Sequence, residues 1–432
     1  MNKQLMAVAV AGALAFPALA FAQSSVTISG VLKVGFDNLR IDGANPARAG
    51  KNTSETRVTD NSSRIIFNMV EDLGNGLAAI GQVDVRFSTD IAANTYATAP
   101  TNVGGTTMSA GGNTWVGLRS KTLGTAIIGR QDLHYGLFEL NEIASKAGAL
   151  MGTGVGLFDF IGGTAIAGGT RTNNVVMYDS PNFSGFDVRV AYSTNPTGVE
   201  TDLVSGTTTR KGGAWNINPK FTAQNWGVRY SYWQQKSDGG SSPSAVGTAP
   251  CTATQTAQGG LPLGGLVGNA CLTAVTQPLD QRGDTILGWF GYGGFKAALG
   301  FNRSSLKSTD FTNTPAGFGV GSTTNERDAW TLPVSYTFGP NTIYGHYTQA
   351  KDDKKTTAVD GAKMYAIAYV YELSKRTSVG LTYAKIKNDT GAAYNFFTNG
   401  GGNSAGQFGS PNGGSLAGEA PSLIQATVRH AF

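Results

Sequence analysis

The sequence predicts an all-β protein, a 16-stranded antiparallel transmembrane β-barrel. Three observations predict it: an alternating strand at the end of the chain, alternating segments along it, and connections that alternate short and long. The last eleven residues read SLIQATVRHAF and stop on Phe432. Their length suits one crossing of a lipid bilayer by a tilted strand. A strand that closes a barrel can place the ring of a terminal Phe in the aromatic girdle at the lipid boundary. These residues alone fit a strand of a soluble sheet equally well, so the choice between a soluble sheet and a membrane barrel depends on the rest of the chain.

The amino terminus reads as a secretory signal peptide over residues 1–22. Lys3 supplies the positive start, a short apolar stretch broken by Pro17 follows, and Ala20-Phe21-Ala22 gives the small-x-small cleavage pattern. The barrel domain is therefore expected over residues 23–432. No later run of roughly 20 apolar residues predicts a membrane helix.

The composition favours strands and turns over helices. The chain has 60 Gly, 21 Phe, 15 Tyr and 6 Trp, and only 14% of its residues are charged. An exported chain of this kind is either a secreted β protein or an outer-membrane barrel. The net charge of +5 is too dilute for a nucleic-acid binder, so no nucleic-acid partner is expected, but it can bias a pore toward anions.

Strand periodicity appears along the whole mature chain. The first strand, 24–38, places Val26, Ile28 and Phe36 on one face and Lys33 on the other. The same alternation recurs over 186–193, 226–235 and 330–338. In a membrane barrel the apolar faces meet lipid and the polar faces line water. Segments 284–292 and 362–372 are apolar on both faces, which fits either a subunit contact or a packed lumen.

Connection lengths give the strand number. Short connections rich in Gly, Asn, Pro or Ser lie at 71–76, 121–124, 180–185, 222–225, 292–294, 339–341 and 373–377. Long polar ones lie at 39–61, 88–112, 131–170, 194–212, 236–282, 303–326, 350–360 and 388–420. Seven short and eight long connections join sixteen strands. Short periplasmic turns with long outer loops are typical of bacterial barrels.

An ordered set of motifs resembles the general porin family of the Neisseria, Burkholderia and Bordetella type. The motifs are Ser63-Arg64-Ile65-Ile66-Phe67 with Glu71-Asp72-Leu73-Gly74-Asn75-Gly76-Leu77, Trp115-Val116-Gly117-Leu118 with Gly129-Arg130-Gln131, Asn173-Asn174-Val175-Val176-Met177-Tyr178, Leu373-Ser374-Lys375-Arg376-Thr377 and Val428-Arg429-His430-Ala431-Phe432. The resemblance implies a homotrimer of 16-stranded barrels in the outer membrane of a Gram-negative cell, each with its third loop folded into the lumen. It also implies contact with outer-membrane lipid and lipopolysaccharide, and with the barrel-assembly machinery during biogenesis.

The chain departs from the family pattern in ways that bear on selectivity. Asn113-Thr114 stands where the family often has an Arg, and Ala431 replaces a frequent basic residue. The third loop is rich in Gly and Ala over 148–169, and the fifth loop is long.

The resemblance implies a water-filled channel for passive diffusion of small hydrophilic solutes and ions. The net positive charge and the basic residues on lumen faces predict a preference for small anions. The alternatives are a channel specific for small organic anions, a barrel enzyme or a surface adhesin. Pore-constriction candidates are the basic residues Arg64, Arg86, Arg130 and Arg171 and the acidic residues Asp84, Asp132 and Glu139. Each basic residue also fits a solvated or wall-paired role. Asp84 is expected to pair with Arg86, and Asp132, Glu139, Glu142 and Asp159 to form the opposing wall.

The sequence offers no pattern of residues suited to catalysis, so neither an enzymatic activity nor a cofactor is expected. The chain has three His and no metal-ligand cluster. Its two cysteines, Cys251 and Cys271, both lie in the fifth loop, and an oxidising compartment favours a disulfide between them.

Overall fold

The computed structural model describes residues 24–43, 45–46, 49–50, 52–87, 89–90, 108–134, 146–147, 157–158, 171–196, 212–237, 279–308, 323–357, 359–396 and 416–432. The predicted signal peptide and both cysteines lie outside the described residues. Within them, no helix is long and apolar enough to cross a membrane.

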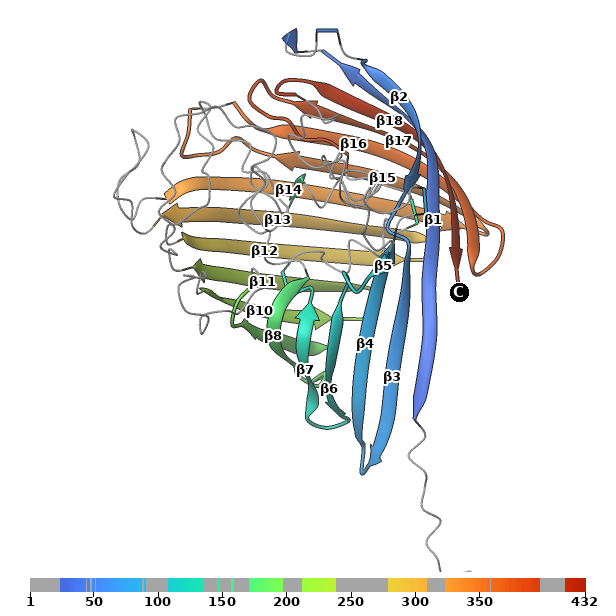
Figure 1. The fold of residues 1–432 in the computed structure, drawn as a ribbon, viewed down its shortest axis with the longest axis vertical. Helices are drawn as coiled ribbons and strands as arrows, with labels where there is room; N and C mark the ends of the chain where they lie inside the picture. The colour runs from blue at the N-terminus through green and yellow to red at the C-terminus, as the bar shows by residue number, and fades with distance from the viewer. Residues whose placement is uncertain are drawn as a thin grey trace, which may run out of the picture.

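The described chain is built from antiparallel strands (Figure 1). Their bounds are β1 Ser25–Asp42, β2 Ser54–Asp60, β3 Arg64–Gly74, β4 Leu77–Phe87, β5 Met108–Ser109, β6 Thr114–Ser120, β7 Gly124–Gln131, β8 Thr172–Asp179, β9 Phe186–Ser193, β10 Gly212–Thr222, β11 Trp226–Ser237, β12 Leu279–Tyr292, β13 Phe295–Ser308, β14 Thr323–Phe338, β15 Asn341–Ala350, β16 Ala362–Glu372, β17 Thr377–Asn388 and β18 Ala420–Ala431.

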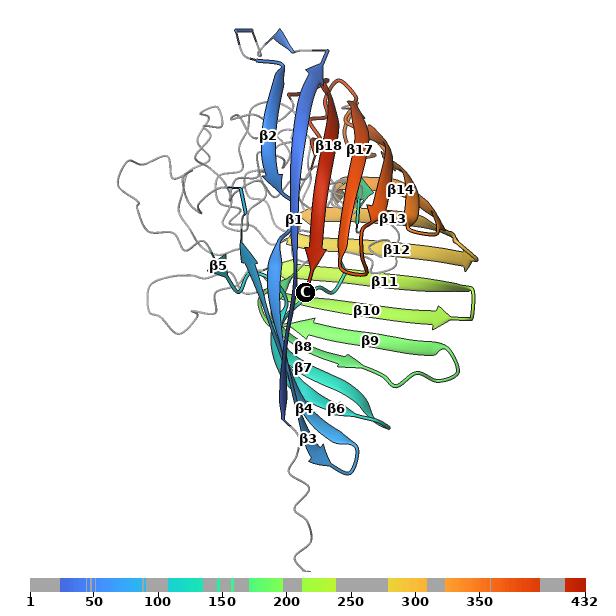
Figure 2. The ribbon, with the colours of Figure 1, turned by 90° about the vertical axis from the view of Figure 1, so that its right-hand side faces the viewer.

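The eighteen strand segments form the sixteen wall strands that the sequence predicts, because two wall strands are each interrupted and divided into two segments. β2 and β3 both pair with β1, on its second and first halves, and together make one wall strand. β5 and β6 both pair with β4 and make another. β18 closes the barrel by pairing with β1 over a long register, and the two lie side by side in both views (Figures 1 and 2). The predicted closed antiparallel barrel is confirmed.

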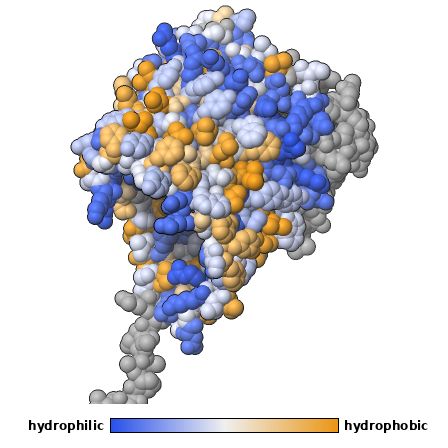
Figure 3. Space-filling view, turned by 180° about the vertical axis from the view of Figure 1, so that it is seen from behind, coloured by the Kyte–Doolittle hydropathy of each residue, from blue (hydrophilic) through white to orange (hydrophobic). Residues whose placement is uncertain are grey.

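The outer face carries the apolar side of each strand, as the alternation predicts. Exposed outward side chains include Phe36, Tyr230, Trp330 and Val428, whereas their neighbours in sequence turn inward. Figure 3 shows hydrophobic residues gathered across the middle of one face, with hydrophilic residues concentrated toward its upper part. This outer face suits a hydrocarbon environment, because lipid provides no partners for polar groups.

The seven short connections fall where the sequence predicts them, but several long ones are shorter than expected. β1 runs to Asp42 and β2 begins at Ser54, although 39–61 was expected as a loop. β13 and β14 likewise extend into 303–326. The outward residues at these strand ends are polar, because the strands continue beyond the apolar band. The alternation of apolar and polar residues that identifies a lipid-facing strand is therefore absent there.

The barrel interior holds two packed apolar clusters. One lies on the inner faces of β15 to β18 and includes Met364, Val370, Ile386 and, from the third loop, Leu157. The other includes Ile127, Met177 and Trp233 and lies on the inner faces of β4 and β7 to β11. The inward apolar residues of 362–372 therefore belong to a packed lumen. Of the two explanations left open by the sequence, a subunit contact or a packed lumen, the second accounts for this inner face.

Candidate functional site: a basic row on the inner wall

A row of six cations crosses the inner wall from β18 through β1 to the start of β8. They are Lys33 of β1, Arg64 of β3, Arg86 of β4, Arg130 of β7, Arg171 before β8 and Arg429 of β18. Register places Lys33 directly opposite Arg429 and Arg64 directly opposite Arg86. Arg64 lies within electrostatic range of Arg86 and Arg429, and Arg130 within range of Arg171 and Arg86. The row is therefore one electrostatic unit.

Like charges directly opposite each other on neighbouring strands destabilise a sheet. Only some of this charge is neutralised locally. Asp84 holds Arg86 through two hydrogen bonds, from Nε at 2.8 Å and Nη2 at 2.7 Å, which is the pair expected from the sequence. By contrast, the guanidinium groups of Arg64, Arg171 and Arg429 have no carboxylate within salt-bridge distance among the described residues. Counted over the described residues, the row thus has more cations than carboxylates.

Both wall-strand interruptions lie at the level of this row. Between β2 and β3, Ser62 adopts a φ of +73°, and the buried Asp60 carboxylate accepts hydrogen bonds from the backbone N–H groups of Ser62 (2.9 Å) and Ser63 (3.1 Å). Asp60 also lies within electrostatic range of Lys33. Interruptions of this kind re-aim side chains, here at the start of the strand that carries Arg64.

Asp132 is fixed among the cations rather than facing them. It directly follows β7, and its carboxylate accepts hydrogen bonds from the Arg171 backbone N–H at 2.7 Å and from Asn113 Nδ2 at 3.1 Å. Arg130 Nε in turn donates to the Arg171 carbonyl at 3.0 Å. The expected position of Asp132 on the opposite wall is wrong, because the residue stays on the wall that β7 forms. Asp132 instead orders the segments that present Arg130 and Arg171.

The structure describes residues 146–147 and 157–158 of the third loop, and these residues contact strands on the inner wall. Lys146 Nζ lies 2.6 Å from Glu372 of β16, and Thr382 of β17 donates to the Ala147 carbonyl at 3.3 Å. Arg327 of β14 approaches the carbonyl of the fully buried Leu157 at 3.5 Å. The contacted side chains of these strands all face inward, since each is more buried than its neighbours in sequence.

Two glycines of the wall make room for third-loop rings. An added Cβ at Gly283 of β12 would lie 2.7 Å from His134 Nε2, and one at Gly300 of β13 would lie 2.9 Å from the Phe158 ring. His134 is buried, with Nδ1 2.8 Å from Ser231 Oγ and Nε2 3.3 Å from Thr285 Oγ1. Burial lowers the pKa of this loop histidine to about 3, so it acts as a neutral anchor and adds no charge to the lumen.

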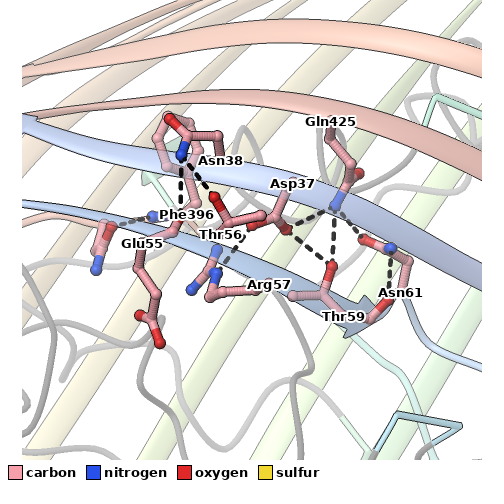
Figure 4. Close-up of polar contacts among 10 residues, drawn as sticks. Asp37, Asn38, Glu55, Thr56, Arg57, Thr59, Asn61, Phe396 and Gln425 are labelled. Atoms are coloured by element: carbon pink, nitrogen blue, oxygen red, sulfur yellow. Dashed lines mark hydrogen bonds and ion pairs between the residues drawn. The ribbon is translucent and has the colours of Figure 1, made fainter.

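A second polar cluster ties the barrel seam toward the outer loops (Figure 4). The buried Asp37 carboxylate of β1 accepts hydrogen bonds from Arg57 (2.8 Å) and Thr59 (2.9 Å) of β2 and from Gln425 (3.2 Å) of β18. A carboxylate with three donors is well satisfied, and its charge is balanced by Arg57. This network holds β1, β2 and β18 together at the barrel seam.

The structure brings most of the predicted constriction residues together and adds others. Arg64, Arg86, Arg130, Arg171, Asp84 and Asp132 lie in one neighbourhood. Glu139, Glu142 and Asp159 lie outside the described residues. Arg429 and Asp60 were missed, although Arg429 alternates with exposed Val428 and could have been placed inward by the same pattern used for Lys33. Phe432 exchanges backbone hydrogen bonds with Gly30 at the seam, at 3.0 and 3.2 Å.

Comparisons with known proteins agree with this architecture. The family model described as "Gram-negative porin" matches residues 7–391. An outer membrane porin protein of Bordetella pertussis is 27% identical over 88% of this chain and 92% of its own. The major outer membrane protein P.IB of Neisseria meningitidis serogroup B is 31% identical over 45% of this chain and 50% of its own.

Solved structures show the same fold. An anion-selective porin from Comamonas acidovorans superposes with a TM-score of 0.64 at 20% identity, covering 95% of this chain and 100% of that one. The outer-membrane protein OmpT of Vibrio cholerae superposes with a TM-score of 0.58 at 13% identity, covering 95% and 98%. The closed barrel, the inward basic row and the family match over most of its length place this chain in the Gram-negative porin family.

Proposed function

We propose that this outer-membrane porin passes small hydrophilic solutes by passive diffusion and prefers small anions. The observation that carries the preference is the row of six inner-wall cations. Within the described residues, Asp60, Asp84 and Asp132 are the carboxylates beside it, which leaves three positive charges in excess. Fixed charges bias which sign of ion enters a water-filled narrowing.

Screening sets the range of this bias. The Debye length is about 10 Å at 0.1 M salt, so groups that line one narrowing act together on a passing ion. We propose that the third loop narrows the lumen opposite the row, supported by its described contacts with β14, β16 and β17. Glu139 then belongs to the facing wall.

Reversal potentials in a planar bilayer under a KCl gradient test the proposal. We expect discrete conductance steps and a reversal potential on the chloride side, with a preference that weakens as the salt concentration rises. Cation preference at low salt would contradict the anion assignment. Absence of conductance steps would contradict the channel itself and favour an adhesin.

One observation favours the narrower candidate, a channel specific for small organic anions. The guanidinium of Arg64, which has no carboxylate within salt-bridge distance in the described part of the chain, has the fork geometry that binds carboxylates through two parallel hydrogen bonds. Block of chloride current by added succinate that saturates with concentration would support this candidate. A linear, unsaturated response would leave general diffusion as the function.

Catalysis is not part of the proposal. Within the described part of the chain, His134 and His346 are buried and hydrogen-bonded to wall hydroxyl groups, and no group of three acidic, His or Cys side chains is arranged for a metal ion.

The proposed partners follow from the family and the barrel's surface. We propose removal of residues 1–22 on export, insertion of 23–432 by the barrel-assembly machinery, and assembly into a homotrimer. Outer-membrane lipid and lipopolysaccharide then cover the exposed apolar band.

A further inference from the structure

The outer face carries charged side chains at the ends of the strands that adjoin the long loops. On β12 to β14 these charges pair with one another. Arg282 lies 3.3 Å from Asp280, and Arg303 holds Asp328 through two hydrogen bonds, at 2.8 and 3.1 Å. This sector is locally neutralised.

The corresponding sector on β16 and β17 is different. Lys363 and Lys387 lie directly opposite each other in the β16–β17 ladder. Both are exposed and point outward, since Met364 and Ile386 beside them are fully buried. Neither lysine has a carboxylate within salt-bridge distance among the described residues. Directly opposed side chains have Cβ atoms about 5 Å apart, so the two ammonium groups repel each other.

The surroundings of this lysine pair add charge and an amphipathic ring. Lys387 Nζ lies 5.8 Å from the centre of the Tyr365 ring. Lys385 faces the same side and pairs with Asp42 at 2.8 Å, and Arg40 of β1 lies within electrostatic range of Asp42. The outward residues of β16 and β17 include no carboxylate. Past the strand ends, the carboxylates of Asp352 and Asp389 flank Gly361, so the positive charge of the patch is concentrated at the lysine pair itself.

We propose that Lys363, Lys387 and Tyr365 form a binding site for the phosphate groups of outer-leaflet lipid headgroups. The lysines lie at the loop-side end of their strands, above the tyrosines that mark the edge of the apolar band. Long loops face outward in bacterial barrels, and tyrosine rings sit at headgroup level. One phosphate between the two ammonium groups converts a repulsive pair into two charge-assisted contacts. The inference rests on the lipopolysaccharide contact proposed above and identifies where it occurs.

A lipid fits this patch better than a second copy of the chain. A protein contact would remove two like charges from water and would need buried carboxylates to compensate them. A headgroup phosphate meets the lysines at the water interface and avoids that cost.

Lipid binding to the purified, detergent-solubilised protein tests the site, with native mass spectrometry as the readout. The probe is lipid A, a doubly phosphorylated glycolipid, and phosphatidylcholine is the neutral comparison. The test variant is Lys363→Gln with Lys387→Gln. The control is Arg282→Gln with Arg303→Gln, which removes the same charge from the paired sector. Heat-modifiable migration on gels verifies that both variants fold.

We expect the lysine variant to raise the Kd for lipid A about thirtyfold, since each basic residue near an anionic surface contributes about 1 kcal/mol. The control should change it much less, and dephosphorylated lipid A should bind wild type as weakly as lipid A binds the lysine variant. An unchanged Kd, or equal losses in both variants, would overturn the site. Cross-links between Lys363 residues of two copies would overturn it in favour of a subunit contact. If no variant and no wild type binds lipid A, the proposed lipopolysaccharide partner itself fails, while the conductance tests are unaffected.

Discussion

At the scale of single residues, selectivity should depend on the cations that have no carboxylate partner in the described part of the barrel. Replacing Arg64 and Arg171 together by Ala should move the reversal potential in a KCl gradient toward the potassium side. At about 10 Å in water, each charge acts on a passing ion with about 0.4 kcal/mol before screening. The shift should therefore be severalfold in permeability ratio at low salt.

The matched control for that variant is Arg303→Ala. Arg303 is exposed on the outer face of β13, a strand that carries no member of the basic row. It should leave the reversal potential unchanged. An equal shift in the control, or none in the double variant, would show that the row does not set selectivity.

Gly283 illustrates how one missing side chain positions a loop. Gly283→Ala should destabilise the protein by about 1–3 kcal/mol, the usual cost of overpacking, because the new Cβ would press on the His134 ring. Thermal unfolding in detergent measures the loss. Gly288→Ala on the same strand is the control, since its added Cβ meets only the Gly227 carbonyl at 3.9 Å. Equal midpoints for the two variants would refute the anchoring role.

At the scale of elements, the loop between β15 and β16 should respond to pH through Asp360. Burial, with Asp353 nearby, raises the pKa of Asp360 above its ordinary value. A carboxyl group whose folded pKa is raised favours the folded loop below its unfolded pKa, and this stabilisation is lost as pH rises through the folded pKa. The loop should therefore tighten on acidification.

Amide hydrogen exchange at Asp353 and Gly361, corrected for the intrinsic rate, measures this response. Asp360→Asn keeps an acceptor for the Asp353 N–H, which donates to Asp360 at 2.8 Å, and removes the titration. Protection in the variant should be independent of pH over the acid range. A wild-type loop that loosens as pH falls would contradict the sign.

The fifth loop carries a prediction that the described residues leave untested. A disulfide between Cys251 and Cys271 would close a segment of about 20 residues and stabilise the loop by roughly 3 kcal/mol in the chain-entropy model. Reduction should loosen the loop without closing the pore, because the fifth loop is expected to lie outside the narrowing. Labelling of both thiols in unreduced protein would show that the bond does not form.

At the scale of the whole molecule, we expect a detergent-stable, heat-modifiable homotrimer. The packed lumen now accounts for the apolar inner face of β16, so the expectation rests on membership of the porin family. Light scattering of purified protein, corrected for bound detergent, measures the mass. A monomer as the sole species would contradict it.

The sequence by itself determined the barrel and much of its inner wall. Alternation places each side chain on one of two faces, so the strand number, the short turns and the inward direction of Arg64 and Arg86 followed from period and spacing. Both interruptions of the wall escaped this reasoning, because Ser62 and the segment 110–113 depart from the period only through backbone conformation and pairing with β1 or β4.

Only the tertiary structure decided which charges meet. Lys33 and Arg429 are almost 400 residues apart in sequence, and closure of β18 on β1 alone makes them neighbours. Asp132 likewise joins the basic row because Asn113 and Arg171 hold it there, which no local pattern indicates. Periodicity reports the direction of a side chain along its own strand, whereas the field in a pore depends on register between strands, and register is a property of the closed sheet.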